Sequence, residues 1–267
     1  MAMPTAWRQE RDALGRGEGA RLMTQAAEKY RFRLGFAKEG PLRWIGHLDL
    51  QTTFSRTLRR AKLPLWFSKG YHPRPKLVFA SALPLGCSSD AELCDLWLRE
   101  ELDAEAVLTR LVAAAPPGLR FTSAELIIGR APAVTTLVQS ASYRVTLPPE
   151  LAADADATGL LAQRLEALLN AETLPRHRRG KDYDLRPLIL ALELVEEEQL
   201  LLCQLMAREG QNGRIEELLD ALELDPAACS KARTALHLET STPAKQPDGP
   251  VADGPVADGP VADATAE

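Results

Sequence analysis

The residues best suited to binding or catalysis lie in a single segment, 68–76, whose sequence is Ser-Lys-Gly-Tyr-His-Pro-Arg-Pro-Lys. Cationic side chains suit phosphate groups, and ring side chains can stack on a base. The two prolines restrict φ and the residues before them, which predicts a stiff, irregular loop. The alternative is a connection that merely crosses between strands. We favour the first interpretation, with five candidate contact residues, namely Lys69, Tyr71, His72, Arg74 and Lys76.

A pair of histidines suggests a second kind of chemistry. His47 stands at the start of a predicted helix, after the segment 40–46, and His72 lies in the loop. Two imidazoles that converge on one phosphate can act as acid and base without a metal. The one nearby carboxylate, Asp49, also suits the positive end of the helix dipole. The pair therefore stays an alternative, in which an enzyme acts on RNA or on a small phosphorylated substrate.

A third basic segment, 176–187, leads into a predicted strand and contains Arg178, Arg179 and Lys181. Contact with nucleic acid and a plain exposed connection are equally good explanations of this segment. No phosphate-binding glycine loop, dinucleotide fingerprint, zinc-protease motif or nucleophile elbow occurs in the chain. We expect no cofactor and no metal.

Charge is segregated along the chain. The net charge is −5, yet residues 29–80 contain twelve basic side chains against Glu39 and Asp49. A concentrated positive potential in an otherwise acidic protein favours an anionic partner such as RNA. A solvated helix face, or a surface that binds an acidic protein, would give the same pattern. Besides the residues named so far, the predicted nucleic-acid interface includes Arg31, Arg33, Arg43, Arg56, Arg59 and Arg60.

Hydrophobic periodicity predicts the elements that must position these residues. Residues 30–36 alternate as a half-buried strand with a basic outer face, and 47–61 form an amphipathic helix with a cationic polar face. Strands are expected at 65–68, 77–83, 92–98 and 120–128, with a helix at 104–114. A similar order follows, with strands at 142–147, 187–196, 200–207 and 232–238 and helices at 160–169 and 214–222. Apart from the short strand at 65–68, both orders are strand, helix, two strands, helix, strand.

The predicted fold class is therefore α+β, with two ferredoxin-like (βαββαβ) halves that arose by duplication, each with helices on one sheet face and the other face open. The expected organisation is an N-terminal extension at 1–28, a basic first half at 29–130, a second half at 140–239 and a tail at 240–267. The tail repeats Gly-Pro-Val-Ala-Asp three times, and such a composition predicts disorder. No membrane span or secretory signal is expected, so we predict a cytoplasmic protein.

Several of these motifs together resemble the radical-SAM-linked protein family. The resemblance covers about residues 30–238 and rests on the segments 42–50, 58–61, 68–76, 82–86 and 181–188, together with Phe54, Leu63, Pro64, Glu92 and Asp95. Members of that family are fused to, or encoded beside, cobalamin-binding-type radical SAM proteins, often near a ribonuclease that processes ribosomal RNA. This chain is similar to the separate form, and Gly46 stands where the family usually has serine.

The resemblance implies a radical SAM protein as a partner on a separate chain. A radical SAM enzyme holds its iron–sulfur cluster with three closely spaced cysteines. The spacing of Cys87, Cys94, Cys203 and Cys229 does not provide such a motif. The sequence thus predicts a non-catalytic accessory subunit that engages transfer or ribosomal RNA through its basic surface.

Overall fold

A computed structural model describes residues 29–69, 71–178 and 180–239. The predicted N-terminal extension and the predicted tail lie outside the described residues, as do Gly70 and Arg179. None of the helices in the described part of the chain is long and apolar enough to cross a membrane.

The first half has the element order that the sequence predicts. Its elements are β1 (Tyr30–Lys38), a 3-10 turn (Gly40–Trp44), α2 (His47–Arg60), β2 (Leu77–Phe79), β3 (Cys87–Leu98), α3 (Ala104–Ala114) and β4 (Leu119–Ile127). Asp103 caps α3 by accepting a hydrogen bond from the amide of Ala106. The helix ends before Pro116, which cannot continue it.

The second half repeats the order with additional short elements. Its elements are α4 (Val134–Leu137), β5 (Val138–Thr146), α5 (Pro149–Ala152), α6 (Ala155–Asn170), β6 (Pro175–Arg178), β7 (Lys181–Asp184), β8 (Ile189–Val195), β9 (Leu200–Arg208), β10 (Gln211–Asn212), α7 (Ile215–Ala221) and β11 (Ser230–Leu238). Asp154 caps α6 through two backbone amides. The fold is therefore mixed α+β.

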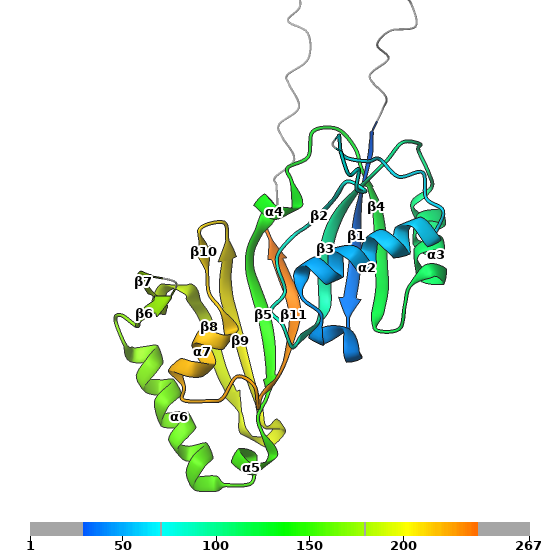
Figure 1. The fold of residues 1–267 in the computed structure, drawn as a ribbon. Helices are drawn as coiled ribbons and strands as arrows, with labels where there is room; N and C mark the ends of the chain where they lie inside the picture. Colours follow the sequence, from blue (N-terminus) through cyan, green and yellow to red (C-terminus); the bar gives the residue numbers. More distant parts are fainter. Residues whose placement is uncertain (1–28, 70, 179, 240–267) are drawn as a thin grey trace, which may run out of the picture.

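The strands of both halves form one large, mostly antiparallel sheet (Figure 1). Its path runs β10-β9-β5-β11-β3-β1-β4, while β2 also pairs with β3 and β8 with β9. Instead of a separate sheet for each half, residues 231–233 of β11 pair in parallel with residues 87–89 of β3. We call this pairing the seam. β6 and β7 form a small hairpin of their own.

Each half has its own hydrophobic core between strands and helices. In the first half, Phe32, Leu34 and Phe36 of β1 pack against side chains of α2 and α3. In the second, Tyr143 and Val145 of β5 pack against α6 and α7. Figure 1 shows α2 and α7 on the near side of the sheet, with the chain that follows β2 between them. The same period-two alternation therefore sets the core face in both halves.

A buried ion pair lies at the seam. The guanidinium of Arg233 donates from Nε to Glu92 Oε1 at 2.7 Å and from Nη2 to Oε2 at 2.5 Å. Both side chains are almost completely buried, with 1% and 3% of their surface exposed. The backbone oxygen of Arg233 also accepts a hydrogen bond from the Ser89 hydroxyl. A buried ion pair and backbone strand pairing thus both join the two halves.

Several predicted boundaries were wrong, for local reasons. β2 ends at Phe79, because the chain turns away toward the seam, and β3 begins at Cys87 because β11 extends its pairing. Residues 65–68 form only isolated bridges. The basic segment 176–187 was predicted to be irregular, but most of it forms the β6–β7 hairpin, in which polar residues pair across the two strands.

The four cysteines are all free and buried. Burial raises the pKa of the Cys87 thiol to about 11 and that of Cys203 to about 12, and it also raises the pKa of Cys94 and Cys229. At pH 8 the thiolate fraction of Cys87 and Cys203 is on the order of a thousandth or less. We expect a thiol reagent at pH 8 to modify none of the four rapidly in native protein and all four in guanidinium. Rapid native labelling of any of them would contradict the buried placement.

Candidate nucleic-acid interface

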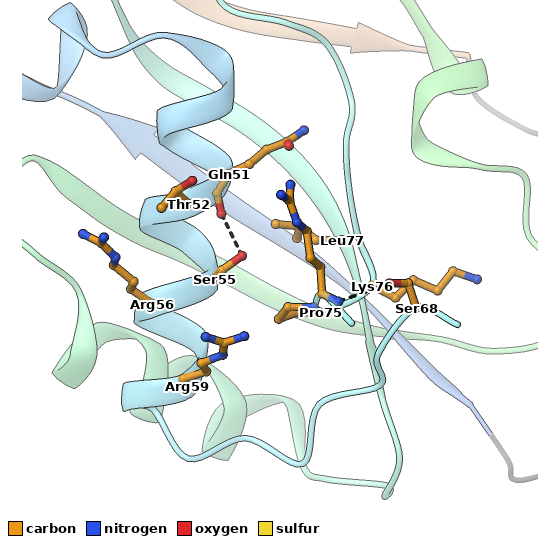
Figure 2. Close-up of a pocket in the computed structure, with 10 residues that line it drawn as sticks. Gln51, Thr52, Ser55, Arg56, Arg59, Ser68, Pro75, Lys76 and Leu77 are labelled. Atoms are coloured by element: carbon orange, nitrogen blue, oxygen red, sulfur yellow. Dashed lines mark hydrogen bonds between the residues drawn. The ribbon is translucent and has the colours of Figure 1, made fainter. Parts of the chain in front are cut away.

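A hollow of about 510 Å³ lies between α2 and the segment that leads into β2. Its walls consist of Gln51, Thr52, Ser55, Arg56, Arg59, Ser68, Arg74, Pro75, Lys76 and Leu77. We call it the basic hollow. Figure 2 shows Gln51, Ser55 and Arg59 on α2, with Pro75, Lys76 and Leu77 across from them. The helix predicted from residues 47–61 and the loop predicted from 68–76 therefore meet at one site.

The helical wall follows from the amphipathic pattern of α2. Leu50, Phe54 and Leu58 are buried against the core, which turns the polar positions between them outward. Phe54 packs edge to face against Phe36 at 4.8 Å between ring centroids. Since successive helical residues are rotated by about 100°, burial of this stripe presents Arg56 and Arg59 to solvent.

The opposite wall is a loop whose base is closed by hydrogen bonds. The amide of Ser68 donates to the carbonyl oxygen of Arg74 at 2.8 Å, and the amide of Arg74 donates to the Ser68 hydroxyl at 3.1 Å. Phe67 and Pro75 form an isolated bridge just below these bonds. Tyr71 is 94% exposed at the end of this loop. The closed base holds the positions of Arg74 and Lys76, as expected for a stiff loop.

The cations of the basic hollow lack internal counter-ions. Among the described residues, no ion pair to a carboxylate involves Arg56, Arg59, Arg74 or Lys76. The ammonium of Lys76 lies over the Trp97 ring, 4.2 Å from its centroid. Unpaired cations around one concavity concentrate a positive potential there. Such a site attracts a polyanion.

Three of the predicted interface residues are used within the fold. Arg31 and Arg33 both pair with the buried carboxylate of Asp95, and the side chains of both arginines are only 14% exposed. Arg31 also donates to the backbone oxygens of Ala131 and Pro132. The chain before α4 therefore covers a strand face that was predicted to be open and basic.

Arg60 has a different internal role. Its guanidinium donates from Nε to the carbonyl oxygen of Ala114 at 2.8 Å, at the last turn of α3. An arginine at a helix C-terminus satisfies a free carbonyl and complements the helix dipole. The side chain is exposed, yet its donors are directed at the neighbouring helix.

The remaining predicted cations lie elsewhere on the surface. Arg43 lies over the exposed ring of Trp44, 5.0 Å from the centroid, and does not line the basic hollow. Lys69 is exposed in the loop. In the second half, Arg178 pairs with Glu217 at 3.4 Å, and Lys181 is exposed across the β6–β7 hairpin. Arg179 lies outside the described residues.

The two candidate acid–base histidines have separate surroundings. His47 Nε2 lies 3.0 Å from Gln51 Nε2, and its ring packs edge to face on Phe79 at 5.4 Å. His72 is exposed, with its ring 4.8 Å from that of Tyr71. Within the described residues no hydrogen bond or ring contact joins the two imidazoles, and neither pairs with a carboxylate. Their contacts are those of packing for His47 and of an exposed surface for His72.

Two polar features of the structure were not among the residues predicted from the sequence. Gln51, Thr52 and Ser55 add amide and hydroxyl groups to the basic hollow, and their one-turn spacing beside Arg59 was the available signal. On the sheet, Ser142 Oγ lies 2.7 Å from His237 Nε2. These residues come from β5 and β11 and are 95 positions apart in the chain, so only the strand register brings them together.

The comparison with protein families identifies the chain over most of its length. Residues 31–215 match the family model DUF2344, described as an uncharacterised protein conserved in bacteria. The chain belongs to this family. The match covers β1 to the start of α7, and thus includes both walls of the basic hollow. None of the curated proteins compared with the chain matches it.

Proposed function

We propose that this protein is a non-catalytic accessory subunit that binds RNA in the basic hollow and presents it to a radical SAM protein. The observation that carries the proposal is the meeting of Arg59 on α2 with Arg74 on the facing loop across the basic hollow, with Arg56 and Lys76 at its rim. None of these four side chains pairs with a carboxylate among the described residues. Neutralised phosphates release counter-ions, which is the main source of sequence-independent affinity for nucleic acid.

The other groups of the site suit a single strand of RNA. The side-chain amide of Gln51 can donate to a phosphate. The hydroxyls of Thr52 and Ser55 donate to carbonyl oxygens of their own helix, and their oxygens can accept from a ribose 2′-hydroxyl. Tyr71 belongs to the loop whose residues Ser68 and Arg74 line the hollow, and it is almost fully exposed. Such a ring can stack on an unpaired base. The site thus combines phosphate contacts with a stacking ring.

The radical SAM partner is proposed from the motifs in the first half. Two of these segments, 42–50 and 82–86, meet in space, because the amide of Gly86 donates to the carbonyl oxygen of Arg43 at 2.8 Å. They expose Trp44, Leu48 and Leu85, with 60%, 74% and 62% of their surfaces accessible. Exposed apolar side chains of this size suit a protein interface. We place the partner on this surface, beside the bound RNA.

We also infer that the two halves are duplicated ferredoxin-like units. The pairing order is β4-β1-β3-β2 in the first half and β11-β5-β9-β8 in the second. In both halves the first and third strands are central, and a helix follows the first and third strands. The seam then joins the last strand of the second unit to the third strand of the first.

The proposal predicts salt-dependent binding of unpaired RNA. If the four cations of the hollow neutralise about four phosphates, the logarithm of affinity falls with that of salt concentration with a slope of about −3. Affinity then drops by a factor of about 60 between 50 and 200 mM salt. Fluorescence anisotropy with a labelled single-stranded RNA measures both quantities. Salt-independent binding, or no binding, would remove RNA as the ligand of the hollow.

A pull-down from native extract tests the partner. We expect the full chain to retain a radical SAM protein and RNA, and a Trp44→Ala/Leu48→Ala variant to retain the RNA alone, because the hollow is unchanged. If both versions retain the same proteins, the partner surface is wrong, while the RNA proposal is tested separately by the anisotropy measurement.

A further inference from the structure

A second cavity, of about 230 Å³, lies where the two halves meet. One wall is the chain that follows β2, and the others come from β5, β6, β10, β11 and the start of α7 with the turn before it. We call it the junction pocket. Its hydrogen-bond donors come from Ser81, Tyr143, Arg178, Asn212, Arg214 and Arg233. The basic hollow shares none of these residues.

The arginines of the junction pocket have unused donors. Glu92 accepts hydrogen bonds from Nε and Nη2 of Arg233. Nη1 of Arg233 makes long contacts of 3.4 Å to Ser81 Oγ and Ala82 O, and the guanidinium also hydrogen bonds to the Tyr143 hydroxyl. Nη1 of Arg178 is buried without a hydrogen-bond partner. A buried donor without a partner destabilises the fold, and more so when it is charged. A ligand that accepts from both groups would recover that cost.

A third guanidinium completes the donor set. Arg214 is exposed at the rim, and no ion pair or side-chain hydrogen bond engages it among the described residues. The carboxylates nearby are Glu216, which lines the pocket, Glu217, 3.4 Å from Arg178 Nε, and Glu92, on the far edge of Arg233. Glu217 pairs with Nε of Arg178, and Glu92 accepts from Nε and Nη2 of Arg233, so neither occupies the unused Nη1 donors. The pocket therefore keeps donors for an incoming acceptor.

We propose that the junction pocket binds the phosphate group of a small molecule. Guanidinium, hydroxyl, phenol and amide donors approach it from several directions, and a phosphate has three terminal oxygens to accept from them. A carboxylate has only two oxygens in one plane and would leave donors unpaired. The volume suits a phosphate monoester of modest size, held by groups from both halves.

Calorimetric titration tests this site with inorganic phosphate and AMP, with succinate as the carboxylate comparator. The titrations use the full chain carrying Arg59→Glu and Arg74→Glu, so that the basic hollow contributes no phosphate binding. We expect AMP or phosphate to bind and Arg214→Ala to weaken binding on the order of tenfold or more, since one charge-assisted hydrogen bond is lost. Arg208→Ala is the matched control, because Arg208 is exposed in the second half and does not line the pocket.

The outcomes separate cleanly. Binding of AMP or phosphate that Arg214→Ala weakens and Arg208→Ala leaves unchanged supports the pocket. No binding of either phosphate probe, or binding equal in both variants, overturns it. Succinate binding as tight as AMP overturns the assignment to phosphate. RNA binding by the unmodified chain is measured separately, so failure here leaves the proposed function untouched.

Discussion

Replacing Arg59 and Arg74 with glutamate should lower the affinity for single-stranded RNA a hundredfold or more at about 50 mM salt. The two residues lie on opposite walls of the basic hollow. Each substitution removes one phosphate contact and adds a negative charge that repels phosphate. The slope of log affinity against log salt should become shallower by about 1.4 units, about 0.7 for each lost contact with a single strand. Anisotropy titrations over a range of salt concentrations measure both changes.

The matched control is the double variant Arg110→Glu/Arg208→Glu, which changes the net charge by the same amount. Both arginines are exposed, and neither lines the hollow nor forms an ion pair among the described residues. We expect this control to lose only a few-fold in affinity, through the general field of the protein. Equal losses in the two double variants would mean that net charge, and not the hollow, accounts for RNA binding.

The largest effect on stability should come from Glu92→Gln at the seam. This change leaves the guanidinium of Arg233 buried beside a neutral amide, and loss of one partner of a buried pair costs about 3 to 5 kcal/mol in the free energy of unfolding. Burial lowers the pKa of Arg233, and the Glu92 carboxylate raises it. The variant lacks the carboxylate, but a guanidinium does not lose its proton in a protein, so Arg233 stays charged. Urea denaturation followed by circular dichroism measures the loss.

Two variants test the cause of this loss. Glu39→Gln removes the partner of Arg120, but both of these side chains are about half exposed, so we expect a change below about 1 kcal/mol. Glu92→Gln/Arg233→Met removes the buried charge as well and should recover part of the stability. A loss below about 1 kcal/mol in Glu92→Gln itself would show that the pair does not hold the seam together.

Local pattern was enough to predict most helices and strands. The alternation of β1 and the apolar stripe of α2 were read correctly, because side chains in these elements repeat with periods of two and about 3.6 residues. α3 was predicted with its observed bounds, since Pro116 ends it. The predicted helix at 47–61 and the predicted loop at 68–76 meet at the basic hollow. They are close in the sequence, with only the short connection 62–67 between them.

The sequence by itself determined how many cations the first half has, and the tertiary structure decided which of them are free. Nothing in the local sequence distinguishes Arg31 and Arg33 from Arg56. Asp95 lies on the neighbouring strand, 64 residues from Arg31 and 62 from Arg33, and binds both. Likewise, Arg233 and Glu92 meet at the seam only because β11 pairs in parallel with β3. Ion pairs between residues so far apart depend on strand order and register, which no local period encodes.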